Sequence, residues 1–182
     1  MKTSMLAILA SLAAFQVTAI ALPAESTPQK RSLGPLPVGS TDGVYIGKLD
    51  GNGTTVWELV SPIKKRDNTL ALDEQSLDKR ANGVNCQNSI VMNSGDRANA
   101  ASALINMCGN GYSWWGSAIA VQSGTAVAYG CNYGNGQTCY SWDISNFFAS
   151  LVASCGNNKA AYWGQGSWKA AYGYTNIGYA FC

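Results

Sequence analysis

The chain has 182 residues, of which 47% are hydrophobic and 12% are charged, and its formal net charge is only +2. This charge is too small for a protein that binds nucleic acid through a strongly basic surface, and the composition also excludes an acidic disordered tail. The chain contains no histidine, which removes the commonest ligand of metal sites and the commonest proton carrier of catalytic sites. Beyond the N-terminus no apolar run reaches the roughly 18 residues of a membrane helix, so we expect no stable membrane span.

Residues 1–21 have the pattern of a secretory signal peptide. A lysine near the start precedes a short apolar stretch over residues 5–15, and the small residues Ala19 and Ala21 follow at the spacing that signal peptidase recognises. The apolar stretch is too short for a membrane anchor. We therefore expect cleavage near Ala21 and a secreted, extracellular protein.

Residues 22–80 form a polar, cysteine-free region that we interpret as a pro-region. A dibasic sequence ending in arginine in a secreted chain resembles the cleavage site of a kexin-type protease, so a processing protease is an expected partner. Three such clusters occur here, and the predicted processing residues are Arg31, Arg66, Lys79 and Arg80. Because the composition changes abruptly after Arg80, we predict that the mature domain spans residues 81–182.

A β-hairpin is predicted inside the pro-region. Residues 44–46 and 55–57 have the composition of short strands, and Asp-Gly and Asn-Gly pairs lie between them at residues 50–53. Asn52 begins an Asn-Gly-Thr sequon and is a candidate glycosylation site. The sequence leaves open whether the segment 32–66 is released, discarded or retained with the mature domain.

The mature domain reads as alternating strands and helices. An apolar strand pattern covers residues 83–92, and Ser94 is the expected N-cap of a helix that ends at Cys108. Strands are then predicted over 112–122 and 125–133, a Gly- and Asn-rich loop over 132–138, a second helix from Ser141 or Asp143 to Cys155, and strands over 160–163 and 168–181 around a turn at 164–166. We therefore predict an α+β, two-layer sandwich in which two helices pack on an antiparallel sheet, in the order β-α-β-β-α-β-β.

The cysteines suggest an internal pseudo-repeat. Each half of the mature domain has a cysteine before its helix, a Cys-Gly-Asn end to the helix, and a cysteine at or near the end of its aromatic hairpin. Six cysteines in a secreted chain predict a disulfide framework, with fifteen possible pairings among which the sequence alone does not choose. The pseudo-symmetry favours the pairs Cys86–Cys182, Cys108–Cys155 and Cys131–Cys139.

Candidate catalytic and metal-binding groups are few. Besides tyrosine and cysteine, the ionisable side chains of the mature domain are Asp96, Arg97, Asp143, Lys159 and Lys169. The two aspartates could form a glycosidase-like pair, but each lies at the start of a predicted helix, where a carboxylate binds free backbone amides. A serine nucleophile would lack its base, and no Cys-x-x-Cys sequence supports a zinc site. We therefore predict a protein that is not an enzyme and that has no cofactor and no metal, and keep a weak hydrolase as a third alternative.

Tryptophan supplies the candidate binding surface. Exposed indole rings beside Asn and Gln side chains suit sugar stacking or a protein contact, whereas buried ones would fill the core. Adjacent tryptophans on a strand must point to opposite faces, so at most one of Trp114 and Trp115 fills the core unless both faces are covered. The five candidates are Trp114, Trp115, Trp142, Trp163 and Trp168.

Three features together give a resemblance: Lys79-Arg80 before the mature start, Val84-Asn85-Cys86 opening the domain, and an aromatic end that closes on Phe181-Cys182. In this layout the chain resembles small secreted cysteine-rich fungal proteins, namely necrosis-inducing effectors and the smut killer toxins with an αβ sandwich. The resemblance implies a non-enzymatic effector or toxin that acts on host or competitor cells by binding a surface protein or glycan. The alternative is a lectin-like module that binds cell-wall glycans.

Overall fold

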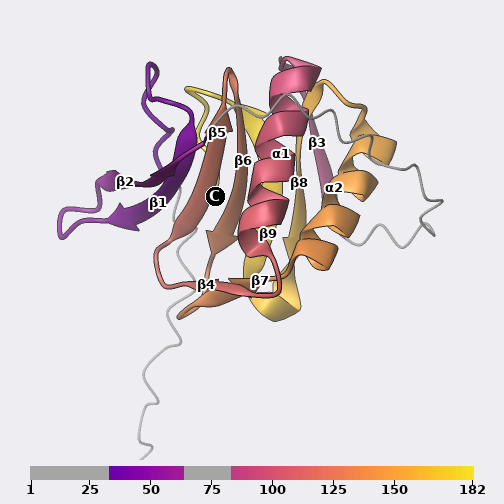
Figure 1. Ribbon diagram of the computed structural model, residues 1–182. Coiled ribbons are helices and arrows are strands. Elements are labelled where there is room, and N and C mark those ends of the chain that lie inside the picture. Colours follow the sequence, from indigo (N-terminus) through magenta and orange to yellow (C-terminus); the bar gives the residue numbers. More distant parts are fainter. Residues whose placement is uncertain (1–32, 64–82) are drawn as a thin grey trace, which may run out of the picture. The chain divides into compact units, whose positions relative to one another are not determined.

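The computed structural model describes residues 33–63 and 83–182, and Figure 1 shows two helices packed against a large sheet. Seven strands form this antiparallel sheet in the order β2-β1-β5-β6-β9-β8-β3, and β4 and β7 form a second, two-stranded sheet. The predicted α+β class is confirmed. The elements are β1 (Gly43–Leu49), β2 (Thr55–Pro62), β3 (Val84–Val91), α1 (Ser94–Cys108), β4 (Tyr112–Trp114), β5 (Ala118–Ser123), β6 (Ala126–Asn132), β7 (Gln137–Cys139), α2 (Ser141–Cys155), β8 (Lys159–Gln165), the 3-10 helix η1 (Gly166–Trp168) and β9 (Ala170–Asn176).

The helices lie antiparallel on one face of the large sheet. Helix α1 covers β5 and β6, and α2 covers β3, β8 and β9. The end of α1 meets the start of α2, where the Ser141 amide donates a hydrogen bond to the Gly109 carbonyl at 2.8 Å. The main core between helices and sheet includes Leu104, Ile144 and Phe148, all fully buried.

The expected pseudo-repeat is visible in the order of the strands. The hairpin β5-β6 lies under α1, the hairpin β8-β9 lies under α2, and β6 pairs with β9 at the centre of the sheet. One further strand flanks each half, because β1 pairs with β5 and β3 pairs with β8, both antiparallel. Strand β1 therefore occupies in one half the place that β3 occupies in the other.

The predicted hairpin around residues 50–53 is present as β1 and β2. The Asp50 carboxylate accepts hydrogen bonds from the amides of Asn52 and Thr54, at 2.9 and 2.7 Å, and this closes the turn. What the sequence did not predict is its placement, since β1 joins the large sheet rather than standing apart from the mature domain.

The prediction of one long strand over residues 112–122 is wrong. It divides into β4 and β5, and β4 leaves the large sheet to pair with β7, inside what was expected to be a loop. The break lies at Gly116, where a Cβ would stand 2.9 Å from the carbonyl oxygen of Gly47. Close approach of the β1 backbone therefore requires glycine there and bends the chain. The predicted last strand is also shorter, because β9 ends at Asn176.

The disulfide pairs are Cys86–Cys155, Cys108–Cys139 and Cys131–Cys182. The pairing favoured by the pseudo-symmetry is therefore wrong in all three pairs. The reason is the antiparallel packing of the helices, which places the end of α1 beside the start of α2 rather than beside its end. All six cysteines are paired, which indicates an oxidising compartment.

The N-cap of α1 is Asn93, one residue before the predicted Ser94. The Asn93 side-chain oxygen accepts a hydrogen bond from the Asp96 amide at 3.0 Å, which satisfies one of the free donors of the first turn. The helix therefore begins one residue earlier than a cap at Ser94 would place it.

We expect Asn93→Ala to lower the free energy of unfolding by about 1 kcal/mol, because the Asp96 amide would lose its acceptor. Ser94→Ala is the matched control and should change the stability by less than about 0.5 kcal/mol, as at an ordinary surface position. Urea denaturation followed by circular dichroism measures both values. A larger loss for Ser94→Ala would restore Ser94 as the cap.

Candidate functional site

The five candidate tryptophans lie in different environments. Trp114 is only 1% exposed and packs edge-to-face on Tyr172, with ring centroids 6.3 Å apart. Trp163 is half-buried and stacks on Phe147 at 5.3 Å. Trp115, Trp142 and Trp168 are 78%, 64% and 42% exposed. Some of the five tryptophans therefore fill the core and others face solvent. The adjacent Trp114 and Trp115 have the lowest and the highest exposed fractions of the five.

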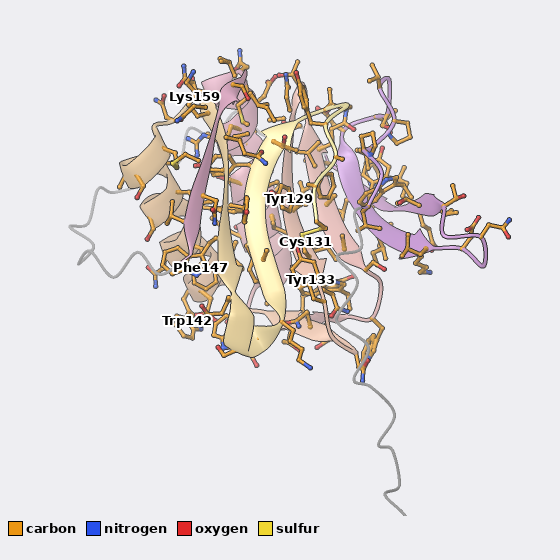
Figure 2. All side chains as sticks on the ribbon, turned by 180° about the vertical axis from the view of Figure 1, so that it is seen from behind. Tyr129, Cys131, Tyr133, Trp142, Phe147 and Lys159 are labelled. Carbon is orange, nitrogen blue, oxygen red and sulfur yellow. A yellow bond between two sulfur atoms is a disulfide. The ribbon has the colours of Figure 1, made fainter. Side chains whose placement is uncertain are left out.

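A cleft of about 370 Å³ lies where the β4-β7 sheet, the start of α2 and η1 meet. Trp115, Tyr140 and Trp168 supply its aromatic walls, while Asp143 and the hydroxyl and amide side chains of β4 and β7 supply its polar groups. Trp142 does not line the cleft; Figure 2 shows it near Phe147, toward the same end of the molecule. The lining residues are Ser113, Trp115, Gly136, Gln137, Thr138, Tyr140, Asp143 and Trp168.

Hydrogen bonds fix the two sides of the cleft to each other. The Gln137 side-chain amide donates to the carbonyl oxygens of Trp168 and Lys169, at 2.6 and 3.3 Å, and so ties β7 to η1. The hydroxyls of Ser113 and Thr138 lie 2.7 Å apart across the β4-β7 sheet. The disulfide Cys108–Cys139 holds the end of β7 to the end of α1. The cleft is therefore largely formed before any ligand arrives, which lowers the entropic cost of binding.

A cluster of aromatic rings around Phe147 packs against the Trp168 wall of the cleft. Phe147 of α2 stacks on Tyr172 at 5.8 Å and contacts the Trp168 ring at 5.8 Å, tilted by 59°. Because Phe147 also stacks on Trp163, one side chain links three neighbouring rings. This packing restricts the Trp168 ring that forms one wall of the cleft.

Among the described residues, Asp143 is the one carboxylate that lines the cleft. Partial burial raises its pKa above the ordinary value of 3.8, because loss of water disfavours the charged form. Burial also raises the pKa of Tyr172, and the negative charge of Asp143 raises it further. The carboxylate therefore sits in a partly dry place, where it is an effective hydrogen-bond acceptor for a neutral polar ligand.

The two aspartates considered as a glycosidase pair do not meet. Asp96, in the first turn of α1, accepts hydrogen bonds from the amide and hydroxyl of Thr125, both at 2.8 Å. Asp143 lies near the opposite end of α1, which has 15 residues and is therefore about 22 Å long. Paired catalytic carboxyls stand roughly 5 to 9.5 Å apart, so these two are not such a pair.

Other predicted features fall outside this site. Asn52 is exposed at the tip of the β1-β2 hairpin, where a glycan would be accessible to solvent. The predicted signal peptide and the processing residues Arg31, Arg66, Lys79 and Arg80 lie outside the described residues. Within residues 33–63 and 83–182, no helix is long and apolar enough to cross a membrane, and no group of three carboxylate or cysteine side chains could hold a metal ion.

The cleft also contains residues that the sequence reading did not select. Gln137 and Thr138 lie at the end of the predicted loop 132–138, and Tyr140 lies between that loop and the second helix, but the structure places Gln137 and Thr138 in strand β7. Ser113 was placed in a strand without a functional role. Residues 137–140 have no alternation of polar and apolar side chains and follow a Gly- and Asn-rich stretch, so no local pattern marked them as a strand.

In chemical terms the described lining of the cleft has three aromatic rings, aliphatic hydroxyls, one side-chain amide and one carboxylate, and it includes no basic side chain. Such a surface suits a neutral ligand that has both apolar faces and hydroxyl groups. Comparisons of the chain with protein-family models, with curated proteins and with solved structures found no match.

Proposed function

We propose that this is a secreted protein that binds carbohydrate at cell surfaces through the aromatic cleft, without catalysing a reaction. The observation that carries the proposal is a largely exposed tryptophan, Trp115, beside Tyr140 and Trp168 in a cleft whose remaining groups are polar. The fully paired cysteines and the predicted signal peptide support an extracellular location.

The chemistry of a sugar ring fits these side chains. A pyranose has C–H faces that pack on an indole or phenol ring, and its hydroxyls require donors and acceptors around the edge. Ser113, Gln137 and Thr138 offer hydroxyl and amide groups, and Asp143 offers a carboxylate. No cationic side chain is among the described residues that line the cleft, which favours neutral sugars over phosphorylated or sulfated ones.

The experiment that tests this proposal is a nuclear magnetic resonance titration of the secreted protein with soluble chitin and β-glucan oligosaccharides. The indole N–H signals of Trp115 and Trp168 should shift in a saturable way, whereas that of the buried Trp114 should move little. Retention on insoluble chitin and β-glucan should follow the same ligand preference. No shift with either glycan would contradict the proposal for these two glycan classes.

The second candidate is an effector or killer-toxin-like protein that binds a surface protein of a host or competitor cell. The exposed Trp142 favours it, because this ring lies outside the cleft and exposed tryptophans are frequent centres of protein contacts. Application of the secreted protein to leaf tissue and to competing fungi tests it. Death or growth arrest that survives loss of glycan binding would favour this candidate over the first.

Binding should weaken on acidification, because a protonated Asp143 no longer accepts hydrogen bonds as a carboxylate. Its pKa is raised above 3.8, so the loss should begin at a higher pH than for an ordinary aspartate. We expect about a tenfold lower affinity below the Asp143 pKa, in line with the loss of one charge-assisted hydrogen bond. Calorimetric titrations at several pH values measure this.

Asp143→Asn is the control for this pH dependence. It cannot ionise, so its affinity should be low and nearly constant over the same pH range. A wild-type affinity that stays constant with pH while the Asp143 carboxyl titrates would exclude this side chain from the ligand contact.

A further inference from the structure

Residues 33–63 complete the large sheet although they belong to the predicted pro-region. Strand β1 pairs with β5 over five consecutive residue pairs, from Gly43 opposite Gln122 to Gly47 opposite Ala118. Figure 1 shows the β1-β2 hairpin beside β5, on the side of the sheet away from α2. This segment takes the place in its half of the sheet that β3 takes in the other.

The segment also covers the face of the sheet that the helices leave free. Leu33, Leu36 and Tyr45 form a second buried cluster with side chains of β6 and with Phe181 near the C-terminus. Phe181 stacks on Tyr129, with ring centroids 4.4 Å apart. The backbone of Leu33 pairs with that of Phe181 in an isolated bridge.

Polar contacts fix the segment at both ends of β5. Near one end, the Gln122 side-chain amide donates to the Ser40 carbonyl at 2.9 Å, and the Gly124 amide donates to the Asp42 carboxylate at 2.8 Å. At the other end, the Ser117 amide donates to the Gly47 carbonyl at 2.8 Å. These bonds fix the register of β1 against β5.

Removal of the segment would expose what it covers. All six residues of β5 are buried, and without β1 this strand would become a sheet edge with apolar side chains and unpaired backbone groups. Such edges promote aggregation, and natural proteins usually protect them. Tyr129 and Phe181 on the second face would lose their cover from Leu33 and Leu36.

No disulfide joins the segment to the rest of the fold. Residues 22–80 contain no cysteine, and all three disulfides lie between residues 86 and 182. The dibasic clusters lie just outside the described ranges, since Arg31 precedes Leu33, Arg66 follows Ile63, and Arg80 precedes Gly83. Hydrolysis of the peptide bonds after these arginines, with water adding across each bond, would leave residues 33–63 without a covalent link.

We propose that the mature protein has two chains: a small one that contains residues 33–63, held non-covalently as the β1-β2 edge of the sheet, and a large one that begins at Ala81. This inference rests on the processing expected for the secreted protein. It is independent of glycan binding, because every residue that lines the cleft lies between Ser113 and Trp168 in the large chain. A negative glycan titration therefore leaves it standing, and a negative chain analysis leaves the glycan proposal standing.

Mass spectrometry of the protein secreted by its processing host tests the chain composition. Native spectra should contain one complex of two polypeptides, and denaturing spectra without reductant should contain the two separately, the small one starting at Ser32 and the large one at Ala81. A single chain that runs from residue 32 to residue 182 would overturn the proposal. So would a native large chain without the small one.

Thermal unfolding at several protein concentrations gives a second test. A complex that dissociates on unfolding has a Tm that rises with concentration, whereas a single chain does not. The double variant Arg66→Ala and Arg80→Ala should stay one chain and lose this dependence. Equal, concentration-independent Tm values for the processed protein and the uncut variant would overturn the proposal.

The interface itself is tested by Tyr45→Asp, since Tyr45 is only 6% exposed and faces the second cluster. After processing, the small chain should be lost from the native complex. Val56→Asp is the matched control, because Val56 lies in the same hairpin but is exposed, and it should retain the small chain. If Tyr45→Asp is not secreted, the concentration dependence of the wild-type Tm decides the matter alone.

Discussion

Trp115→Ala is expected to weaken glycan binding by about 10- to 100-fold while leaving the free energy of unfolding unchanged within about 0.5 kcal/mol. The ring is 78% exposed, so its loss creates no cavity in the core. It also forms one aromatic wall of the cleft, and the loss of a stacking surface removes a main contact to a sugar ring. Calorimetric titration with the preferred oligosaccharide, together with urea denaturation, measures the two quantities.

Trp142→Ala is the matched control for that substitution. It removes an equally large and similarly exposed ring at the same end of the molecule, but this ring does not line the cleft. Glycan affinity should therefore stay within about twofold of wild type. Loss of binding in Trp142→Ala with normal binding in Trp115→Ala would place the ligand outside the cleft and favour a protein contact through Trp142.

The sequence was sufficient to predict the two helices and two of the hairpins, because the signals for these elements are local. Both helices, the β5-β6 hairpin and the β1-β2 hairpin follow from apolar periodicity and from turn residues within a few positions. The break after Trp114 was not predicted, because its cause is the β1 backbone, which approaches Gly116 from a part of the chain about seventy residues away. A contact of that range leaves no mark in the local pattern.

The disulfide pairing could not be predicted, because it depends on how the helices are oriented. The repeated Cys-Gly-Asn ends suggested that the two helix ends meet, which would require parallel helices. The helices are instead antiparallel, so each cysteine at a helix end pairs with one that precedes the other helix or lies on β3.

The cleft was only partly predictable for a similar reason. Exposed tryptophan was expected to form a binding surface, but Trp115 and Trp168 are separated by more than fifty residues and are brought together by β7 and η1. Alternation along a strand explains why Trp114 is buried and Trp115 is not, yet the sequence does not say which of the two faces the core. That choice is made by Tyr172, which packs on Trp114 from a distant strand.

Removal of the Cys131–Cys182 disulfide is the second change with a large expected effect. The bond closes a loop with a sequence separation of 51 residues, for which the chain-entropy model gives about 4 kcal/mol of stabilisation. It also holds the C-terminus where Phe181 packs between Trp57 and Tyr129. We therefore expect the double variant Cys131→Ala and Cys182→Ala to unfold at a much lower urea concentration than wild type.

The substitution of exposed Tyr179 by alanine provides a control near the same end of the chain, and it should change the stability by less than about 0.5 kcal/mol. The double cysteine variant should also expose the cluster of Leu33, Leu36 and Phe181, because no covalent bond then ties residue 182 to β6. Increased binding of a hydrophobic dye below the unfolding transition would report this exposure. If the double variant unfolds at the wild-type urea concentration, the packing of Phe181 alone holds the C-terminus, and the disulfide serves the lifetime of the protein outside the cell rather than its equilibrium stability.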